Sequence, residues 1–256
     1  MVGSNTMKKE VKIPVCNILG VNIAAIDMEW LNEFTDMHIK ELSGEYLCVS
    51  NVHTTVTAWE DKEYCEIQNR GIMAIPDGVP LVLISRRRGF KQMERTDGPR
   101  YMLAVLERSA NMGYRHFFYG STQETLDKMR RVLEKEYPGV QIAGMYSPPF
   151  RALTEKEDED VIKMINEARA DFVWIGLGAP KQERFMAAHQ GKIRGFMIGI
   201  GAGFDYLAGN IKRAPMWMQN CSLEWFYRMI QDPRRLFWRY MRTNSIFIWL
   251  TIFKGK

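Results

Sequence analysis

The chain has 256 residues, of which 46% are hydrophobic and 25% charged, and this fits one large globular α/β domain or one domain with an appendage. The formal net charge of +5 favours an anionic partner: a nucleotide, a nucleic acid or an acidic lipid. The four scattered cysteines form no CxxC pair, which argues against a zinc site or a disulfide framework and favours free thiols in a reducing compartment. No apolar run suits a signal peptide or a membrane-spanning helix.

Short apolar segments rich in β-type residues alternate with segments of helical periodicity. The predicted strands are 11–15, 18–23, 46–49, 72–75, 117–119, 140–143, 172–175 and 196–200. The predicted helices are 28–42, a helix ending at 69, 99–111, the segment striped by Leu126, Met129 and Leu133, 155–170, and a helix ending near 189. The first two strands suit a hairpin or sheet edge. The rest predict a Rossmann-like α/β fold, a mostly parallel sheet with helices on both faces, followed by a helical C-terminal appendage.

Polar or glycine-rich turns follow four of the predicted strands. They begin at Asn51, Asp77, Gly120 and Gly176. In open α/β sheets the carboxyl ends of parallel strands line the ligand crevice. We therefore expect these turns to converge at one edge of the sheet, with His53 and Ser121 beside them.

The stretch from 171 to 185 combines a buried strand, a glycine turn and the start of a helix. Gly176 and Gly178 permit a tight turn or a close ligand, and Pro180 suits the first turn of the helix. Free N–H donors at such a helix start can hold an anionic group. An ordinary βα turn without a ligand is the alternative. A similar glycine turn runs from Gly201 to Asp205.

Asp77 has two interpretations, because it lies at a strand's carboxyl end beside Gly78. It is either a turn or helix-capping residue or a general base in the crevice. The arginines at 86–88 are either a solvated face or an anion site.

Several catalytic motifs are absent from the sequence. There is no GxxxxGK[ST] loop, no HExxH, no GxSxG, and no third glycine after Gly176-Leu177-Gly178. The D-x-D at 158–160 lies in an acidic helix start, which favours a capped, solvated end over a metal site. A transferase built on this chain would therefore stabilise a leaving diphosphate with N–H groups and arginines.

The segment after Lys212 changes character. From Arg228 to Lys256 it carries seven Arg or Lys residues, interleaved with aromatic residues, and a single acid, Asp232. Such helices suit an anionic membrane surface, which we favour here, although nucleic-acid binding or a cap packed on the core would use the same residues. We expect two domains, a catalytic domain at 1–210 and a membrane-associated helical appendage at 211–256.

Eight motifs occur in an order that resembles a known family. They are Cys48-Val-Ser-Asn51-Val-His53, Ile75-Pro-Asp77-Gly78-Val-Pro80, Glu94-Arg95-Thr-Asp-Gly98, Phe118-Tyr-Gly120-Ser121, Gly176-Leu-Gly178-Ala-Pro180-Lys-Gln182-Glu183, Gly201-Ala-Gly203-Phe204-Asp205, Arg213-Ala214-Pro215, and Glu224-Trp225-Phe-Tyr-Arg228 followed by Pro233-Arg-Arg235. Together they resemble the WecG/TagA/CpsF family of bacterial glycosyltransferases from about residue 18 to residue 242.

The resemblance implies an inverting, metal-independent enzyme without a cofactor, peripheral on the inner, cytoplasmic face of the bacterial membrane. Such enzymes move a sugar, often N-acetylmannosamine, from a UDP donor to a polyprenyl-diphosphate-linked saccharide. Their products are teichoic acid linkage units, enterobacterial common antigen, capsule or exopolysaccharide. No nucleic acid takes part, and assembly into a homo-oligomer stays open.

The family pattern also assigns roles to residues of this chain. Asp77 is implied as the catalytic base. The implied donor-binding residues are Asn51, His53, Gly120, Ser121, Gly176, Gly178, Pro180, Gln182, Glu183, Gly203 and Asp205. The implied diphosphate and acceptor residues are Arg88, Arg213, Arg228, Arg235 and Arg239.

One departure from the family concerns Val49, since teichoic-acid members often carry Thr two residues before the Asn. Ser50 or His53 could replace it, so the donor sugar stays open. The rival hypothesis is a non-catalytic module that binds a nucleotide or nucleic acid through its basic tail. The carboxylate at Asp77 argues against it, because an acid repels phosphate.

Overall fold

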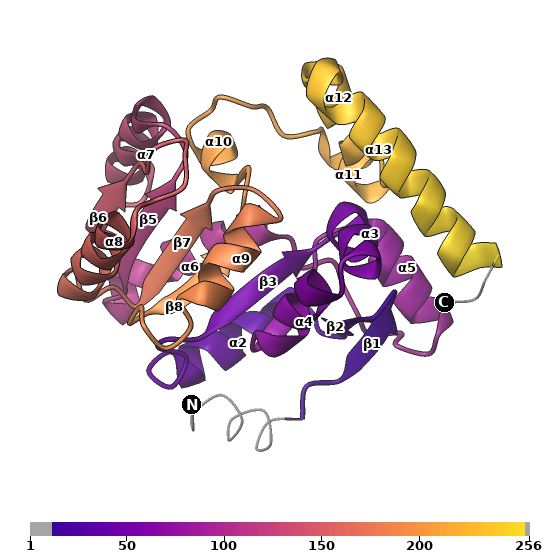
Figure 1. The fold of residues 1–256 in the computed structure, drawn as a ribbon, viewed down its shortest axis with the longest axis horizontal. Helices are drawn as coiled ribbons and strands as arrows, with labels where there is room; N and C mark the ends of the chain where they lie inside the picture. The colour runs from indigo at the N-terminus through magenta and orange to yellow at the C-terminus, as the bar shows by residue number, and fades with distance from the viewer. Residues whose placement is uncertain (1–11, 254–256) are drawn as a thin grey trace.

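The computed structural model describes residues 12–253 and contains one eight-stranded sheet with helices around it (Figure 1). Its strands are β1 (Val15–Ile18), β2 (Val21–Ala24), β3 (Tyr46–Ser50), β4 (Met73–Pro76), β5 (Arg115–Gly120), β6 (Gln141–Tyr146), β7 (Phe172–Gly176) and β8 (Phe196–Gly199). They lie in the order β1-β2-β4-β3-β8-β7-β5-β6. Only β1 and β2 pair antiparallel, as the predicted hairpin, and the other neighbours are parallel. The predicted α/β class is confirmed.

Helices cover both faces of the sheet because its central strands are apolar on both sides. The helices of the α/β part are α2 (Met28–His38), α3 (Val52–Glu60), α4 (Lys62–Arg70), α5 (Val79–Arg87), α6 (Gly98–Met112), α7 (Gln123–Glu136), α8 (Glu155–Glu167), α9 (Lys181–Ala188) and α10 (Gly203–Leu207). One core cluster joins α2, α6, α7 and α10 to the sheet, with Trp174 and Phe118 fully buried in it. The second joins α3, α4, α8 and α9 to the opposite face. Alternate residues of β7 therefore enter different cores, which is typical of a parallel strand in a three-layer fold.

Several predicted elements differ from the structure; among them, the helix predicted at 155–170 ends at Glu167. The helix predicted at 28–42 ends at His38. The helix predicted to end at 69 is two helices, because Asp61 leaves the helical conformation and caps α4 by accepting the Tyr64 N–H. Helix α5 was not predicted, although Pro80 stands in its first turn and Leu81 and Val82 are buried. The first strand was predicted at 11–15 but runs from Val15 to Ile18, and Val11 lies outside the described residues.

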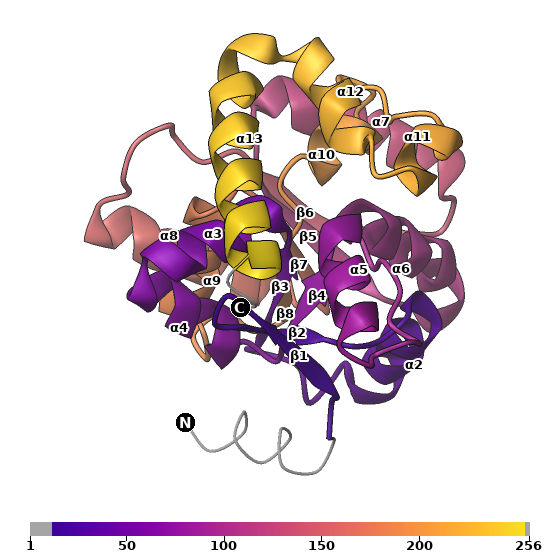
Figure 2. The same cartoon turned by 90° about the vertical axis from the view of Figure 1, so that its right-hand side faces the viewer.

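The chain after residue 210 is helical wherever it is described. It forms α11 (Met216–Asn220), α12 (Glu224–Gln231), α13 (Pro233–Ile248) and a short π-helix (Trp249–Phe253). Helix α13 crosses the sheet edge and packs on α3, where Arg242 pairs with Glu60 at 2.7 Å (Figure 2). Phe247 and Leu250 join the core cluster that includes Val56 and Ala58 of α3, and Leu236 is also buried. The tail therefore covers the carboxyl ends of the central strands. The proposed domain division at residue 210 stays a prediction, and Lys254 and Lys256 lie outside the described residues.

Candidate active site

A cleft of about 910 Å³ lies between the carboxyl ends of β3, β4, β7 and β8 and the helices of the tail. The strand order explains its place, because β3 connects to β4 on one side while β8, β7 and β5 lie on the other. The direction of winding thus reverses between β3 and β8, and ligands of open α/β sheets bind at such a switch point. Residues predicted for the site that line it are Asn51, His53, Asp77, Gly178, Pro180, Gln182, Gly203, Arg213, Arg228, Arg235 and Arg239.

Asn51 faces Asp77 across the floor of the cleft. As the N-cap of α3, Asn51 uses its Oδ1 to accept the N–H groups of His53 and Thr54 at 3.0 and 3.2 Å. Its amide nitrogen is then free to point elsewhere, and it donates to Asp77 Oδ2 at 3.5 Å. The capping role therefore fixes the direction in which this side chain meets the carboxylate.

Asp77 lies in an ionic network rather than at a helix cap. Gly78 and not Asp77 is the N-cap of α5, so the helix-capping interpretation of Asp77 is wrong. Arg95 donates its Nε to the Asp77 carbonyl and places its Nη2 3.7 Å from Asp77 Oδ1. Burial raises the pKa of the Asp77 carboxyl; Arg95 opposes this, and the carboxylates of Asp97 and Glu224 add to it. The result is a half-buried carboxylate whose pKa is higher than that of an ordinary aspartate, which suits a general base.

The same network ties the tail to the sheet. Arg95 Nη2 lies 2.6 Å from Glu224 on α12, and Arg213 Nη2 lies 2.6 Å from the fully buried Asp97. These charges are buried or partly buried and mutually paired, so removal of one would leave a partner uncompensated. Closure of the tail and placement of the groups around Asp77 are therefore physically coupled.

The glycine turn after β7 contributes to the cleft through Gly178. Its φ is 77° and a Cβ there would meet open space, so glycine is required by the backbone and leaves room for a ligand. Gln182, at the start of α9, accepts the Gly201 N–H at 3.0 Å and donates to Glu183 at 2.8 Å. Glu183 is fully buried, and burial raises the pKa of its carboxyl to about 7. It acts on the cleft through Gln182, because it does not line the cleft itself.

Arginines from the tail line the cleft on the side opposite the strands, which we call its roof. Arg228, Arg235 and Arg239 all line the cleft, and Arg228 and Arg213 each place a guanidinium 5.7 Å from the ring centre of Tyr206. This stacking holds both arginines over the cleft. Several arginines aimed into one partly buried space are suited to a diphosphate.

His53 faces the same roof and is neutral at physiological pH. Burial, with Arg239 and Arg242 adding, lowers the pKa of its imidazole to about 4. Its buried Nδ1 has no hydrogen-bond partner among the described residues. The ring can therefore offer a hydrogen bond to a ligand without carrying a charge.

The structure does not bring every predicted residue into the cleft. Gly120 ends β5 and Ser121 follows it, and β7 separates this strand from β8. A side chain at Gly120 would meet the Gly176 backbone. Gly176 accommodates the Phe204 ring, and Asp205 accepts hydrogen bonds from Asn210. Arg88 turns away and donates to the Asn17 carbonyl of the hairpin. These residues, with Glu183, shape the surroundings of the cleft but do not line it.

Other polar or charged lining residues had no role assigned from the sequence, among them Arg95, Asp97, Lys181, Tyr206 and Glu224. Arg87 also lines the cleft, and it belongs to the run at 86–88 for which an anion site was left open. Arg95 and Glu224 stood within two of the motifs quoted above, so the motifs contained a usable signal. Tyr206 had none, since its role depends on two arginines brought by the tail.

Three further findings concern the described residues. No three His, Cys, Asp or Glu side chains within residues 12–253 are grouped as metal ligands would be. None of the described helices combines the length and the apolar character needed to cross a bilayer. All four cysteines are free thiols, as predicted.

Comparison with known proteins identifies the family. Residues 16–256 match the model of the family described as "Glycosyl transferase WecG/TagA/CpsF family". An N-acetylglucosaminyldiphosphoundecaprenol N-acetyl-beta-D-mannosaminyltransferase of Bacillus subtilis is 31% identical over 210 residues, which is 82% of this chain and 78% of that protein. A Staphylococcus aureus enzyme of the same name is 27% identical over 192 residues, or 75% of this chain and 74% of the relative. The chain therefore belongs to the WecG/TagA/CpsF family of glycosyltransferases.

Proposed function

We propose that this enzyme transfers N-acetylmannosamine, or a related hexose, from a UDP donor to a polyprenyl-diphosphate-linked N-acetylglucosamine. The names of the relatives specify this transferred sugar and this acceptor for those proteins. The observation that carries the proposal is the cleft itself, where the Asp77 carboxylate lies beneath arginines. Sugar transfer from a nucleotide diphosphate requires a base for the acceptor hydroxyl and positive groups for the leaving diphosphate, and this cleft contains both.

In the proposed reaction Asp77 accepts the proton of an acceptor hydroxyl as its oxygen attacks the anomeric carbon of the donor. The bond from that carbon to the UDP oxygen breaks on the opposite face, so the configuration inverts. The proton stays on the Asp77 carboxyl, whose raised pKa favours that transfer. Asn51 orients the carboxylate through its amide nitrogen.

Arginines stabilise the negative charge that develops on the leaving diphosphate. Arg228, Arg235 and Arg239 supply planar N–H donors from one side, and the turn at Gly178 leaves room for backbone approach from the other. One well-aimed donor contributes about 3 kcal/mol to stabilising such charge. Three arginines can therefore support departure of UDP, and we propose that no divalent metal is needed.

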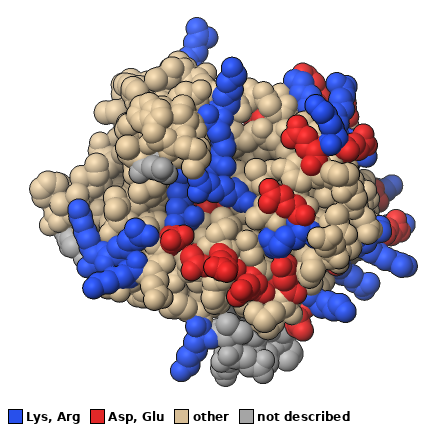
Figure 3. Space-filling model, turned by 180° about the vertical axis from the view of Figure 1, so that it is seen from behind, with Lys and Arg blue, Asp and Glu red and all other residues tan. Residues whose placement is uncertain are grey.

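We further propose that the tail places the cleft at the anionic inner surface of the bacterial membrane. Exposed side chains of the tail include Met216, Trp217, Ile230, Trp238, Ile248, Trp249, Ile252 and Phe253. In Figure 3 the left side of the view, where the tail and α5 lie, shows Lys and Arg among uncharged residues, whereas most Asp and Glu lie at the centre and the right. Trp238 is 76% exposed and shares α13 with four arginines, a combination typical of interfacial helices.

The proposal is tested by incubating the purified enzyme with a detergent-dispersed polyprenyl-diphosphate-N-acetylglucosamine and a panel of UDP-sugars, with EDTA present. We expect acceptor-dependent release of UDP from one donor and a β-linked product by NMR of the anomeric proton. Release that requires added Mg²⁺ or Mn²⁺ would refute metal independence. Release without acceptor, or none across the panel, would refute the proposed transfer.

A further inference from the structure

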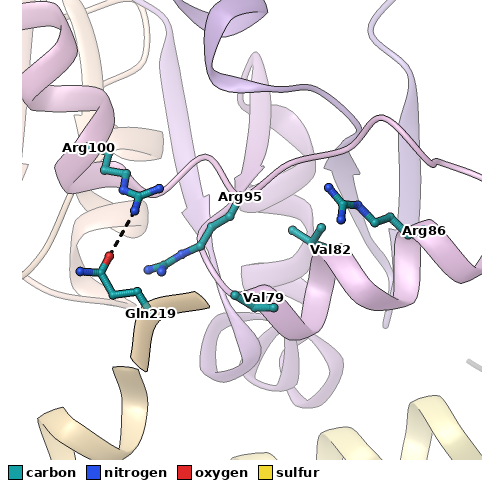
Figure 4. A pocket seen from close by; sticks show the side chains of 6 residues that line it. All are labelled: Val79, Val82, Arg86, Arg95, Arg100 and Gln219. Atoms are coloured by element: carbon teal, nitrogen blue, oxygen red, sulfur yellow. Dashed lines mark hydrogen bonds between the residues drawn. The ribbon is translucent and has the colours of Figure 1, made fainter. Parts of the chain in front are cut away.

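A second, smaller pocket of about 210 Å³ lies against another face of α5 (Figure 4). Its lining comes from α5, the loop after α5, the start of α6, and α11. The lining residues are Val79, Val82, Arg86, Arg95, Arg100 and Gln219. None of them is among the donor or diphosphate residues that the family pattern implied, although the sequence left an anion site at 86–88 open.

The lining of this pocket is basic and contains no acid. Arg86 and Arg100 stand at its two ends with Arg95 between them (Figure 4). Three acids pair with Arg95, namely Asp77, Asp97 and Glu224, and all three line the catalytic cleft and not this pocket. Asp97 also lies 3.3 Å from Arg100 Nε, so Arg86 is the lining arginine that keeps an uncompensated charge among the described residues. Arg86 donates its Nε to the Met93 carbonyl, and no ion pair joins Arg86 to an acid in the described part of the chain. Its remaining N–H donors are thus available to an anion.

Arg95 connects the two spaces, because it lines both the pocket and the catalytic cleft. Its Nη2 lies 3.7 Å from Asp77 Oδ1. An anion in the pocket is therefore separated from the base by the width of one guanidinium group.

The tail completes the pocket and adds an apolar rim. Gln219 of α11 accepts from Arg100 Nη2 at 3.3 Å, and Met216 Sδ lies 3.8 Å from the same nitrogen. Met216 is 58% exposed, and Trp217, the next residue of α11, is 61% exposed. A basic pocket with exposed apolar side chains at its edge matches the chemistry of a diphosphate joined to a hydrocarbon chain.

We propose that this pocket binds the diphosphate of the lipid-linked acceptor, apart from the donor diphosphate held under the tail arginines. The inference rests on the proposed function, in which two diphosphates must be bound at once. The acceptor sugar then lies over Arg95 with its hydroxyl at Asp77, and its prenyl chain leaves past Met216 and Trp217. Because Gln219 belongs to the tail, acceptor binding and tail closure favour each other.

The kinetic test compares Arg86→Gln with Arg130→Gln, the same change of charge on the exposed face of α7. Arg86 is exposed and keeps only one backbone contact, so the variant folds as the parent does. A hydrogen bond to a charged group corresponds to roughly a tenfold to hundredfold change in affinity. We expect Arg86→Gln to raise the acceptor KM by about tenfold or more, with the donor KM and kcat retained. An unchanged acceptor KM, or an equal rise with Arg130→Gln, overturns the proposal.

A binding test separates this inference from the proposed function, since it needs no turnover. Farnesyl diphosphate, inorganic diphosphate and UDP are each titrated calorimetrically into the parent and Arg86→Gln proteins. Loss of farnesyl diphosphate affinity with UDP affinity retained supports the pocket, even for an enzyme that uses none of the UDP-sugars tried. Equal losses for farnesyl diphosphate and UDP overturn a separate pocket. Inorganic diphosphate that binds as tightly as farnesyl diphosphate overturns the lipid-linked source.

Discussion

Replacement of Asp77 by asparagine separates the chemical role of this residue from its structural one. Asparagine has nearly the same shape and can keep the contact with Asn51, but it cannot accept a proton at neutral pH. A positioned general base contributes about 10²–10⁴-fold to rate, or roughly 3–5 kcal/mol of barrier. We therefore expect kcat to fall by at least about 100-fold while the affinity for UDP is retained, because the tail arginines are untouched.

The variant is also expected to remain folded. Arg95 keeps Glu224 at 2.6 Å and Asp97 at 3.9 Å as partners when the Asp77 charge is removed. The folded-state pKa of Asp77 is raised above 3.8, so its ionised form costs stability as the pH rises through the folded pKa. Asp77→Asn removes that cost, and its Tm at pH 8 should be no lower than that of the parent.

The assay measures UDP release, UDP binding by calorimetry, and Tm for Asp77→Asn and for Asp127→Asn, an exposed surface control on α7. The pH–rate profile of the parent adds a second readout. Activity should rise with pH as Asp77 loses its proton, with a midpoint above 3.8 because burial raises the pKa. Near-normal kcat in Asp77→Asn would refute its role as the base. Loss of UDP binding together with activity would show a disrupted site instead.

Three further predictions follow from burial and exposure. The pKa of Glu183 is about 7 in the folded protein and near 4.5 in the unfolded chain, so the free energy of unfolding should fall by roughly 3 kcal/mol between pH 4.5 and 7. Urea unfolding of Glu183→Gln should lack this fall. The same pH dependence in the parent and the variant would contradict the prediction. The imidazole of His53 has a pKa of about 4, so its NMR chemical shifts should be those of a neutral ring from pH 5.5 to 8. His53→Ala should raise the donor KM by roughly fivefold, which corresponds to the loss of one neutral hydrogen bond. A charged ring at pH 6 would refute the site geometry. Replacing Trp238 and Trp249 by serine should weaken binding to anionic vesicles by about tenfold or more in flotation assays. The control is Phe150→Ser, which changes an exposed aromatic residue on the β6–α8 loop and should not weaken binding, because that loop lies far from α13 (Figure 1). Equal effects of the two replacements would refute the membrane role of the tail.

The sequence by itself determined the features that depend on near neighbours. Apolar runs such as 172–175 were recognisable as buried strands, and the turns after β3, β4 and β7 could be placed because capping and glycine conformations involve only a few residues. The ordered motifs also determined the family, and with it the expectation for Asp77. Strand pairing does not enter any of these inferences, so they did not require the fold.

Only the tertiary structure decided which of these turns share a cleft. The turns at Asn51 and Gly120 look equivalent in sequence, but β7 lies between β5 and β8, so Gly120 remains outside. Arg95 and Glu224 are 129 residues apart and meet only because α12 folds back over the sheet edge. Whether a charged side chain contributes to a site depends on its burial and on the groups that pair with it. Both depend on packing between segments that are far apart in the sequence.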